Sequence, residues 1–212
     1  MSIDSFKNVL VLAPHTDDGE FGCGGTMARL IENGVTVTYT AFSTAAKSVP
    51  EGFPRDVLKH EVRAATGVLG IAPEDLRVYD FEVRTFPTVR QDILEEMIVL
   101  QRELDPDCVL LPALIDLHQD HKTIAEEGLR AFKRTTVMAY EIPWNNLNFS
   151  QQAYVRLEER HIEKKVAALQ CYASQGHRNY LNEDYIRNVA LTRGINISCG
   201  YAEVFEVYRW IL

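Results

Sequence analysis

The sequence predicts an α/β fold with a mostly parallel sheet that is flanked by helices on both faces. Short apolar runs end at proline or at turn residues, as buried strands of parallel sheets do. Amphipathic segments of helical period separate these runs. The first strand, helix and second strand form a βαβ unit, whose crossover is almost always right-handed. The 212 residues contain no linker, repeat or low-complexity tract, so we expect one domain.

The first unit begins with VLVLAPHTDDGEFGCGGTMARL. Val9–Ala13 is short and apolar and is closed by Pro14, which predicts a fully buried strand. Phe21–Asn33 carries apolar residues on one face and is followed by Gly34, which predicts a helix with a glycine stop. Val35–Phe42 is β-branched and aromatic and predicts the second strand.

The middle of the chain alternates in the same way. Ser43–Arg55 has turn residues and no clear period, so we expect a surface loop there. Val57–Leu69 and Val89–Glu103 have helical periods. Leu76–Phe81 and Asp107–Pro112 predict strands, and the second of these is a buried run that again ends in proline.

The last third continues this alternation and ends on a strand. We expect, in chain order, a helix from about Lys122, a strand over Thr136–Tyr140, a loop over Pro143–Ser150, helices over Glu158–Tyr172 and Glu183–Arg193, and a strand over Ala202–Trp210.

The composition argues against several classes of protein. The formal net charge of −8, without a basic stripe, disfavours a nucleic-acid partner. The start of the chain lacks the basic and apolar regions of a signal peptide, and no apolar run reaches the roughly 18 residues of a membrane span. The four cysteines are scattered and form no CxxC pair, which favours reduced thiols. We therefore expect a cytoplasmic protein without a membrane span.

Two clusters of histidine and aspartate directly follow predicted strands. The first is His15-Thr16-Asp17-Asp18, and the second, roughly 100 residues later, is His118-Gln119-Asp120-His121. Ligands of parallel sheets bind beyond the carboxyl ends of the strands, so we expect the clusters to meet at one sheet edge. Imidazole and carboxylate donors together suit zinc, iron, manganese or cobalt better than magnesium, which prefers oxygen ligands.

Other interpretations of these residues exist. The first cluster is also compatible with a solvated turn whose aspartate caps a helix, or with an acidic pocket for magnesium or a phosphoryl group. The second is compatible with surface histidines at a helix start. Gly22-Cys23-Gly24-Gly25 does not match GxGxxG, and the acidic run would repel a pyrophosphate, so we interpret the glycines as packing residues. The occurrence of both clusters after strands favours the metal site.

Several other polar segments are candidates for substrate contacts. Trp144 with its two following asparagines, and Ser174-Gln175 with Arg178, suit a sugar, although a packed loop and a helix cap explain them equally well. Lys47 and Arg55 are interpreted as solvated charges rather than as an anion site.

At the two clusters the sequence resembles the LmbE-like, or PIG-L, family of metal-dependent de-N-acetylases. The family's PHxDD motif corresponds to Pro14–Asp18, and its HxDH motif corresponds to His118–His121. The chain departs from many relatives in having Gly19 before Glu20, and from some in having Asp116 at the position of a tyrosine. Weaker similarities lie at Gly22–Thr26, Lys165, Ser174-Gln175 and Ala202-Glu203.

The resemblance implies a single LmbE-like deacetylase domain over residues 1–212 with a Rossmann-like sheet. It assigns six site residues: His15, Asp18 and His121 as metal ligands, Asp17 as general base, His118 as the polarising or acid group, and Asp120 as the residue that orients His118.

The function implied by the resemblance is zinc-dependent removal of the N-acetyl, or another N-acyl, group from an amino sugar or an N-acetylglucosamine conjugate. Fe2+, Mn2+ and Co2+ are alternatives to Zn2+. The expected partner is the small amino-sugar substrate. Because members of the resembled family commonly form oligomers, the resemblance also implies a homo-oligomer. Two alternatives stay open: a metal-dependent amidase or esterase acting on a non-sugar molecule, and a non-catalytic metal- or sugar-binding domain.

Overall fold

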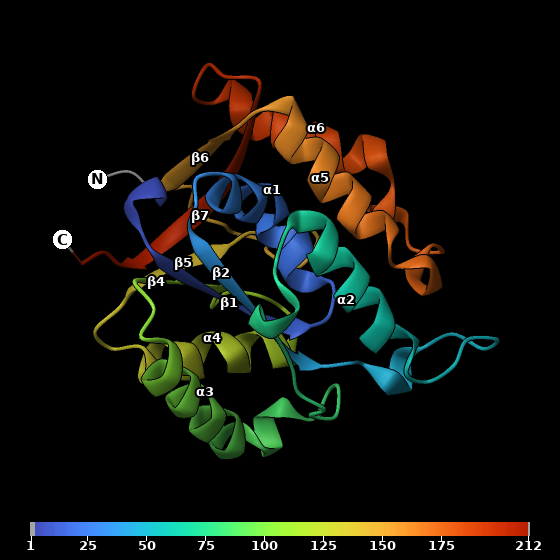
Figure 1. The fold of residues 1–212 in the computed structure, drawn as a ribbon. Coiled ribbons are helices and arrows are strands. Elements are labelled where there is room, and N and C mark those ends of the chain that lie inside the picture. Colours follow the sequence, from blue (N-terminus) through green and yellow to red (C-terminus); the bar gives the residue numbers. More distant parts are fainter. Residues whose placement is uncertain (1–2, 212) are drawn as a thin grey trace.

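The computed structural model describes residues 3–211, which form a seven-stranded sheet between two layers of helices (Figure 1). The strands are β1 (Asn8–His15), β2 (Thr36–Ser43), β3 (Leu76–Val78), β4 (Cys108–Pro112), β5 (Thr136–Tyr140), β6 (Ala153–Leu157) and β7 (Tyr201–Arg209). Their order across the sheet is β3-β2-β1-β4-β5-β7-β6. The first five strands run parallel, whereas β7 pairs antiparallel with both β5 and β6.

Helices cover both faces of the sheet. They are α1 (Asp18–Glu32), α2 (Val57–Leu69), α3 (Arg90–Leu104), α4 (Gln119–Ala131), α5 (Glu159–Gln170) and α6 (Glu183–Ile195). Figure 1 shows α3 and α4 on one face and the other four helices on the opposite face. Successive residues of β1 divide between two apolar cores, with Val9 and Val11 in one core and Leu10 and Leu12 in the other. This alternation is the expected consequence of a strand buried on both faces.

The predicted fold class is confirmed, and the positions of most elements agree closely. The helix predicted over Val57–Leu69 and the strand predicted over Thr136–Tyr140 have the predicted bounds. Both helices that follow the clusters start earlier than expected, at Asp18 and Gln119. The motif residues themselves form the first helical turns, where the helix dipole favours carboxylates.

The sheet edges differ from the sequence-based expectation. The strand expected over Leu76–Phe81 is limited to the three residues of β3. The edge strand β6 was not predicted. It is only five residues long, and its alternation is limited to buried Val155, exposed Arg156 and buried Leu157. The antiparallel direction of β7 is also not visible in a hydrophobic pattern, because that pattern reports faces rather than directions.

Helix α1 lies directly against the sheet because it has glycine at the contact points. A Cβ atom at Gly22 would lie 2.1 Å from the ring of Tyr140, and one at Gly19 would lie 2.5 Å from the ring of Tyr39. The interpretation of these glycines as packing residues is thus confirmed. The close approach brings the start of α1 down to the end of β1.

A buried ion pair supports α1 at an internal kink. Cys23 has a non-helical backbone with φ −147°. Beyond it, the Glu203 carboxylate accepts hydrogen bonds from the backbone N–H groups of Gly25 (3.0 Å) and Thr26 (2.7 Å). Lys165 Nζ donates to Glu203 at 2.7 Å and to a carbonyl oxygen before the kink at 2.6 Å. The pair therefore replaces hydrogen bonds that the kink removes from the helix.

Two expectations from composition can be compared with the structure. Among residues 3–211, no helix has both the length and the apolar character that crossing a membrane requires. All four cysteines are free thiols, as expected.

Candidate metal centre and active-site pocket

The fold brings the two His/Asp clusters together at one edge of the sheet. Strands β1 and β4 are parallel neighbours, so their carboxyl ends lie side by side. His15 is the last residue of β1, and Asp18 begins α1. The segment after β4 leads into α4, and His121 lies in the first turn of that helix.

Three donor atoms form a compact triangle. His15 Nδ1 lies 3.0 Å from Asp18 Oδ2, His121 Nε2 lies 3.2 Å from the same oxygen, and the two nitrogens are 3.4 Å apart. A tetrahedral cation with bonds of about 2.0–2.1 Å keeps its ligand atoms roughly 3.3–3.4 Å apart. The triangle therefore fits three ligands of a divalent transition metal and leaves a fourth position for water or substrate.

His118 extends this cluster. One ring nitrogen from each of His15, His118 and His121 falls within a mutual distance of 4.8 Å. His118 is the N-cap of α4, and its Nδ1 accepts a hydrogen bond of 3.2 Å from the backbone N–H of Asp120. Nε2 is therefore the protonated nitrogen of the neutral ring.

Aspartates hold the far sides of two histidine rings. Asp120 Oδ2 lies 3.0 Å from His15 Nε2, and Asp116 Oδ2 lies 2.9 Å from His121 Nδ1. Such contacts fix the orientation and the tautomer of a ligating imidazole. The role of Asp116 was missed, because sequence comparison marked it only as a departure from relatives.

The contacts of Asp120 differ from those expected. Its carboxylate was expected to orient His118, but it contacts His15 instead, and only its backbone N–H reaches His118. Residues two apart at a helix start do not face each other, so closeness in sequence was misleading. The same carboxylate accepts hydrogen bonds from the backbone N–H groups of Arg84 (2.5 Å) and Phe86 (3.3 Å), which ties the segment before α3 to the metal centre.

Asp18 and His121, two corners of the donor triangle, have strongly shifted pKa values. Burial opposes protonation of His121, but the charges of Asp18 and Asp116 raise its pKa to about 10. The same burial opposes ionisation of Asp18, but His121 and His15 hold its pKa well below the ordinary value. A field this negative around the donor triangle also favours a divalent cation.

Asp17 and His118 have pKa values suited to proton handling. Burial and the neighbouring charge of Asp18 raise the pKa of Asp17 to about 6. Burial and the other two imidazoles lower the pKa of His118 to about 4. Near neutral pH, these values leave Asp17 as a proton acceptor and His118 as a neutral hydrogen-bond donor.

Glu20, the fourth charged residue of the opening motif, lies outside the metal centre. Its buried carboxyl group bonds to the hydroxyls of Tyr39 and Tyr172, and burial raises its pKa to about 8. Both hydroxyls also bond to the carbonyl oxygen of Thr16, at 2.8 Å and 2.5 Å. This group therefore fixes the peptide that precedes Asp17.

A pocket of about 340 Å³ opens over the donor triangle. Its aromatic wall contains Trp144 and Tyr180, which stack with ring centroids 4.3 Å apart, and Phe21, which meets both rings edge-on. Arg84 and Arg178 also line it. The sequence indicated Trp144 and Arg178 as candidates, but Tyr180 and Arg84 carry no motif and were missed.

Comparison with known proteins gives consistent matches. Residues 10–132, more than half of the chain, match the model of the PIG-L family, described as GlcNAc-PI de-N-acetylase. The chain is 26% identical over 180 residues to the uncharacterized deacetylase YaiS of Escherichia coli, covering 82% of this chain and 94% of that protein. It is 25% identical over 223 residues to a diacetylchitobiose deacetylase of Thermococcus kodakarensis, covering 93% and 81% of the two chains.

One solved structure with the same fold is named as a hydratase, whereas the two relatives above are named as deacetylases. GalB, a 4-carboxy-2-hydroxymuconate hydratase of Pseudomonas putida, superposes with a TM-score of 0.80 and 22% identity, covering 97% of this chain and 98% of that one. At this identity the likeness establishes the fold alone.

Proposed function

The chain belongs to the PIG-L family of de-N-acetylases, and from this membership we propose that it is a zinc-dependent hydrolase of N-acetylated amino sugars or their conjugates. The observation that carries the proposal is the donor triangle of His15, Asp18 and His121, with Asp17 beside it in the same pocket. Removal of a longer N-acyl group would use the same residues.

The donor set suits zinc. Two imidazoles and one carboxylate are typical of catalytic zinc sites, and they also accept Fe2+, Mn2+ or Co2+. Bound there, such a cation supplies Lewis acidity that polarises an amide carbonyl and makes water more acidic.

The residues around the cation divide the remaining work. Asp17 accepts a proton from the attacking water as the C–O bond forms, and His118 Nε2–H donates a hydrogen bond to the developing oxyanion. The C–N bond then breaks, and the nitrogen takes the proton held by Asp17. The products are acetic acid and the free amine, which become acetate and an ammonium group when the acid gives its proton to the amine, so atoms and charge balance.

The pocket walls support a sugar as the acylated amine. Trp144, Tyr180 and Phe21 form an aromatic surface on which a sugar ring can stack, and Asn145, which also lines the pocket, can offer its amide group to hydroxyls. The similarity to a diacetylchitobiose deacetylase also supports this substrate class.

A direct assay tests the proposal. Acetate and amine release are measured from N-acetylglucosamine, diacetylchitobiose and an N-acetylated amino acid, using protein that has been chelated and then reloaded with zinc. We expect release from the sugars that depends on zinc. Preference for the amino acid would favour the non-sugar amidase, and binding of metal and sugar without any release would favour a binding domain.

One control is required because a shared fold does not determine a reaction. Hydration of an unsaturated carboxylic acid is measured with the same preparation. If the protein hydrates this acid and releases no acetate from any N-acetyl substrate, the proposed function is wrong and a hydratase replaces it.

We also propose that the enzyme is a cytoplasmic homo-oligomer. Its four free thiols suit a reducing compartment. Leu117 and Leu147 are 64% and 75% exposed, on loops joined by a hydrogen bond from the Leu117 N–H to the Asn145 carbonyl. In sedimentation at micromolar concentration we expect an oligomer, and Leu147→Asp is expected to weaken it. A wild-type monomer would remove this part of the proposal.

A further inference from the structure

In the part of the chain that the structure describes, two arginines of the active-site pocket have no carboxylate partner. Arg84 and Arg178 both line the pocket, and within residues 3–211 neither is ion-paired with an aspartate or a glutamate. Arg178 Nε donates to Gln175 Oε1 at 2.8 Å, and Arg84 Nη2 donates to Ser48 Oγ at 3.3 Å. These neutral partners position the guanidinium groups but leave their charges available to a ligand.

Arg178 is held further by an aromatic neighbour. Its guanidinium carbon lies 5.6 Å from the centre of the Tyr180 ring, which is the ring that stacks on Trp144. Arg178 thus continues the aromatic wall on which we place the sugar. Burial raises the pKa of Asp17, and the charge of Arg178 is one of the weaker influences that oppose this rise.

Arg84 occupies an unusual backbone position at the pocket. Its φ of +70° lies in the left-handed region, where glycine is the least strained residue. The conformation is held by the hydrogen bond from its N–H to Asp120 Oδ2, the oxygen that also contacts His15. Strain of this kind at a non-glycine residue points to a use for the side chain.

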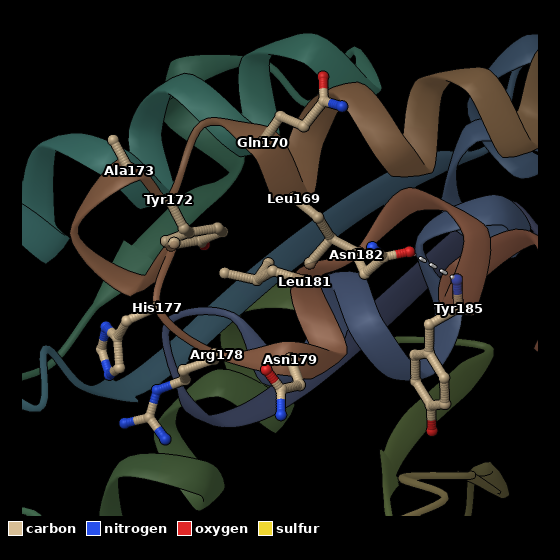
Figure 2. Close-up of a pocket in the computed structure, with 11 residues that line it drawn as sticks. Leu169, Gln170, Tyr172, Ala173, His177, Arg178, Asn179, Leu181, Asn182 and Tyr185 are labelled. Carbon is tan, nitrogen blue, oxygen red and sulfur yellow. Dashed lines mark hydrogen bonds between the residues drawn. The ribbon is translucent and has the colours of Figure 1, made fainter.

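A second pocket shares the lining residue Arg178 with the first. This pocket of about 610 Å³ lies between the end of α5 and the start of α6, and Figure 2 shows His177, Arg178 and Asn179 side by side along it. None of its lining residues is acidic, in a chain with 30 aspartates and glutamates. In the first pocket the acidic lining residues are Asp17 and Asp18, and the proposed mechanism uses both.

We propose that Arg84 and Arg178 form an anion subsite, so that the preferred substrate carries a carboxylate or a phosphate on the group attached to its amino sugar. The inference rests on the proposed function and narrows its substrate class. Guanidinium groups bind both anions through paired N–H donors. Because Arg178 lines both pockets, the remainder of the attached group can extend into the second one.

The test compares three substrates that share one sugar. They are N-acetylglucosaminyl malate with carboxylates, N-acetylglucosamine 1-phosphate, and the neutral methyl N-acetylglucosaminide. For wild-type enzyme we expect kcat/KM to be about tenfold or more higher for an anionic substrate than for the methyl glycoside, and the preferred anion identifies the attached group. Such a preference corresponds to about 1.4 kcal/mol or more.

Variants of the two arginines test the assignment. Arg84→Gln and Arg178→Gln are each expected to lower the anionic-to-neutral ratio of kcat/KM about tenfold, mainly by raising KM for the anion. The ratio is used because an indirect effect on Asp17 changes all three substrates equally. Arg63→Gln is the matched control, because Arg63 is exposed on α2 and lines neither pocket.

Arg84→Gly separates charge from folding. Glycine relieves the positive φ, so this variant is expected to melt no lower than wild type and still to lose the anion preference. Equal kcat/KM for all three substrates in wild type would overturn the anion subsite and leave the deacetylase intact.

If the enzyme deacetylates none of the three substrates, the result counts against the proposed function instead. The anion subsite is then tested by titration calorimetry, which measures ligand affinity on the zinc-loaded protein. Tighter binding of N-acetylglucosamine 1-phosphate than of the methyl glycoside, lost in both arginine variants, supports it, and equal binding overturns it.

Discussion

Two aspartates four residues apart in the sequence orient the histidine rings of the candidate metal centre. Asp116 and Asp120 lie on one short segment, yet they hold rings from different elements, His121 on α4 and His15 on β1. The two His/Asp motifs identified the imidazoles and carboxylates that metal binding and proton transfer require. They did not reveal which carboxylate serves which imidazole, because that depends on how the first turn of α4 is oriented.

Asp116→Asn is expected to weaken metal binding about 10–100-fold, because the amide no longer provides a negative partner for His121 Nδ1. Competition with a chromophoric chelator measures this affinity. Asp92→Asn, at an exposed position on α3, is the control. Equal zinc affinity in all three proteins would show that Asp116 does not support a ligand.

Asp17→Asn is expected to keep most of its metal and to lose about 10² or more in kcat, the usual scale for removal of a general base. Asp17 lies in the pocket but outside the donor triangle, which is why metal content and rate are expected to separate. Metal analysis beside acetate release measures both. A near wild-type rate would exclude Asp17 as the base.

At the scale of elements, α1 depends on side chains from distant parts of the chain. Its kink at Cys23 is supported by Glu203 from β7 and Lys165 from α5. The sequence suggested the helix, its glycine contacts and even the two supporting residues as family similarities. It did not predict the kink, because only tertiary structure shows which backbone groups lose their helical partners.

Removing one member of the buried pair is expected to cost about 3–5 kcal/mol of unfolding free energy, because an unpaired buried charge remains. Lys165→Met and Glu203→Gln are measured by urea unfolding, and the double variant is expected to cost less than the sum of the two. Glu82→Gln breaks the exposed Lys47–Glu82 pair and is expected to change stability by about 1 kcal/mol or less. Equal losses at the buried and exposed pairs would contradict this account.

At the scale of the whole molecule, the candidate metal centre joins segments that are far apart in the sequence. His15 and Asp18 flank the first strand–helix junction, and His121 lies in the first turn of the helix after β4. Apolar runs predicted that β1 and β4 are buried on both faces, as strands of parallel sheets are, and from this the meeting of the clusters at one sheet edge was expected. The direct pairing of β1 with β4 was not predicted. The pocket wall could not be predicted, because Arg84 and Tyr180 lie in irregular segments without a period or motif.

Zinc is expected to stabilise the fold by mass action. At free zinc about 1,000 times the dissociation constant, the gain is about 4.1 kcal/mol. For a chain of this size that corresponds to roughly 8–16 °C in Tm. Thermal melts with zinc and with chelator measure the difference, which His121→Ala is expected to abolish. A zinc-induced shift of equal size in that variant would exclude His121 as a ligand.

The bond between Arg84 and Asp120 is made by the main chain of residue 84, not by its guanidinium group. Any amino acid other than proline keeps that N–H, so position 84 can change its side chain while His15 stays anchored through Asp120. The chemistry of amide cleavage and the choice of substrate are therefore separable at this position. Natural divergence or laboratory selection can alter what the pocket accepts through a single codon, with the reacting centre left intact.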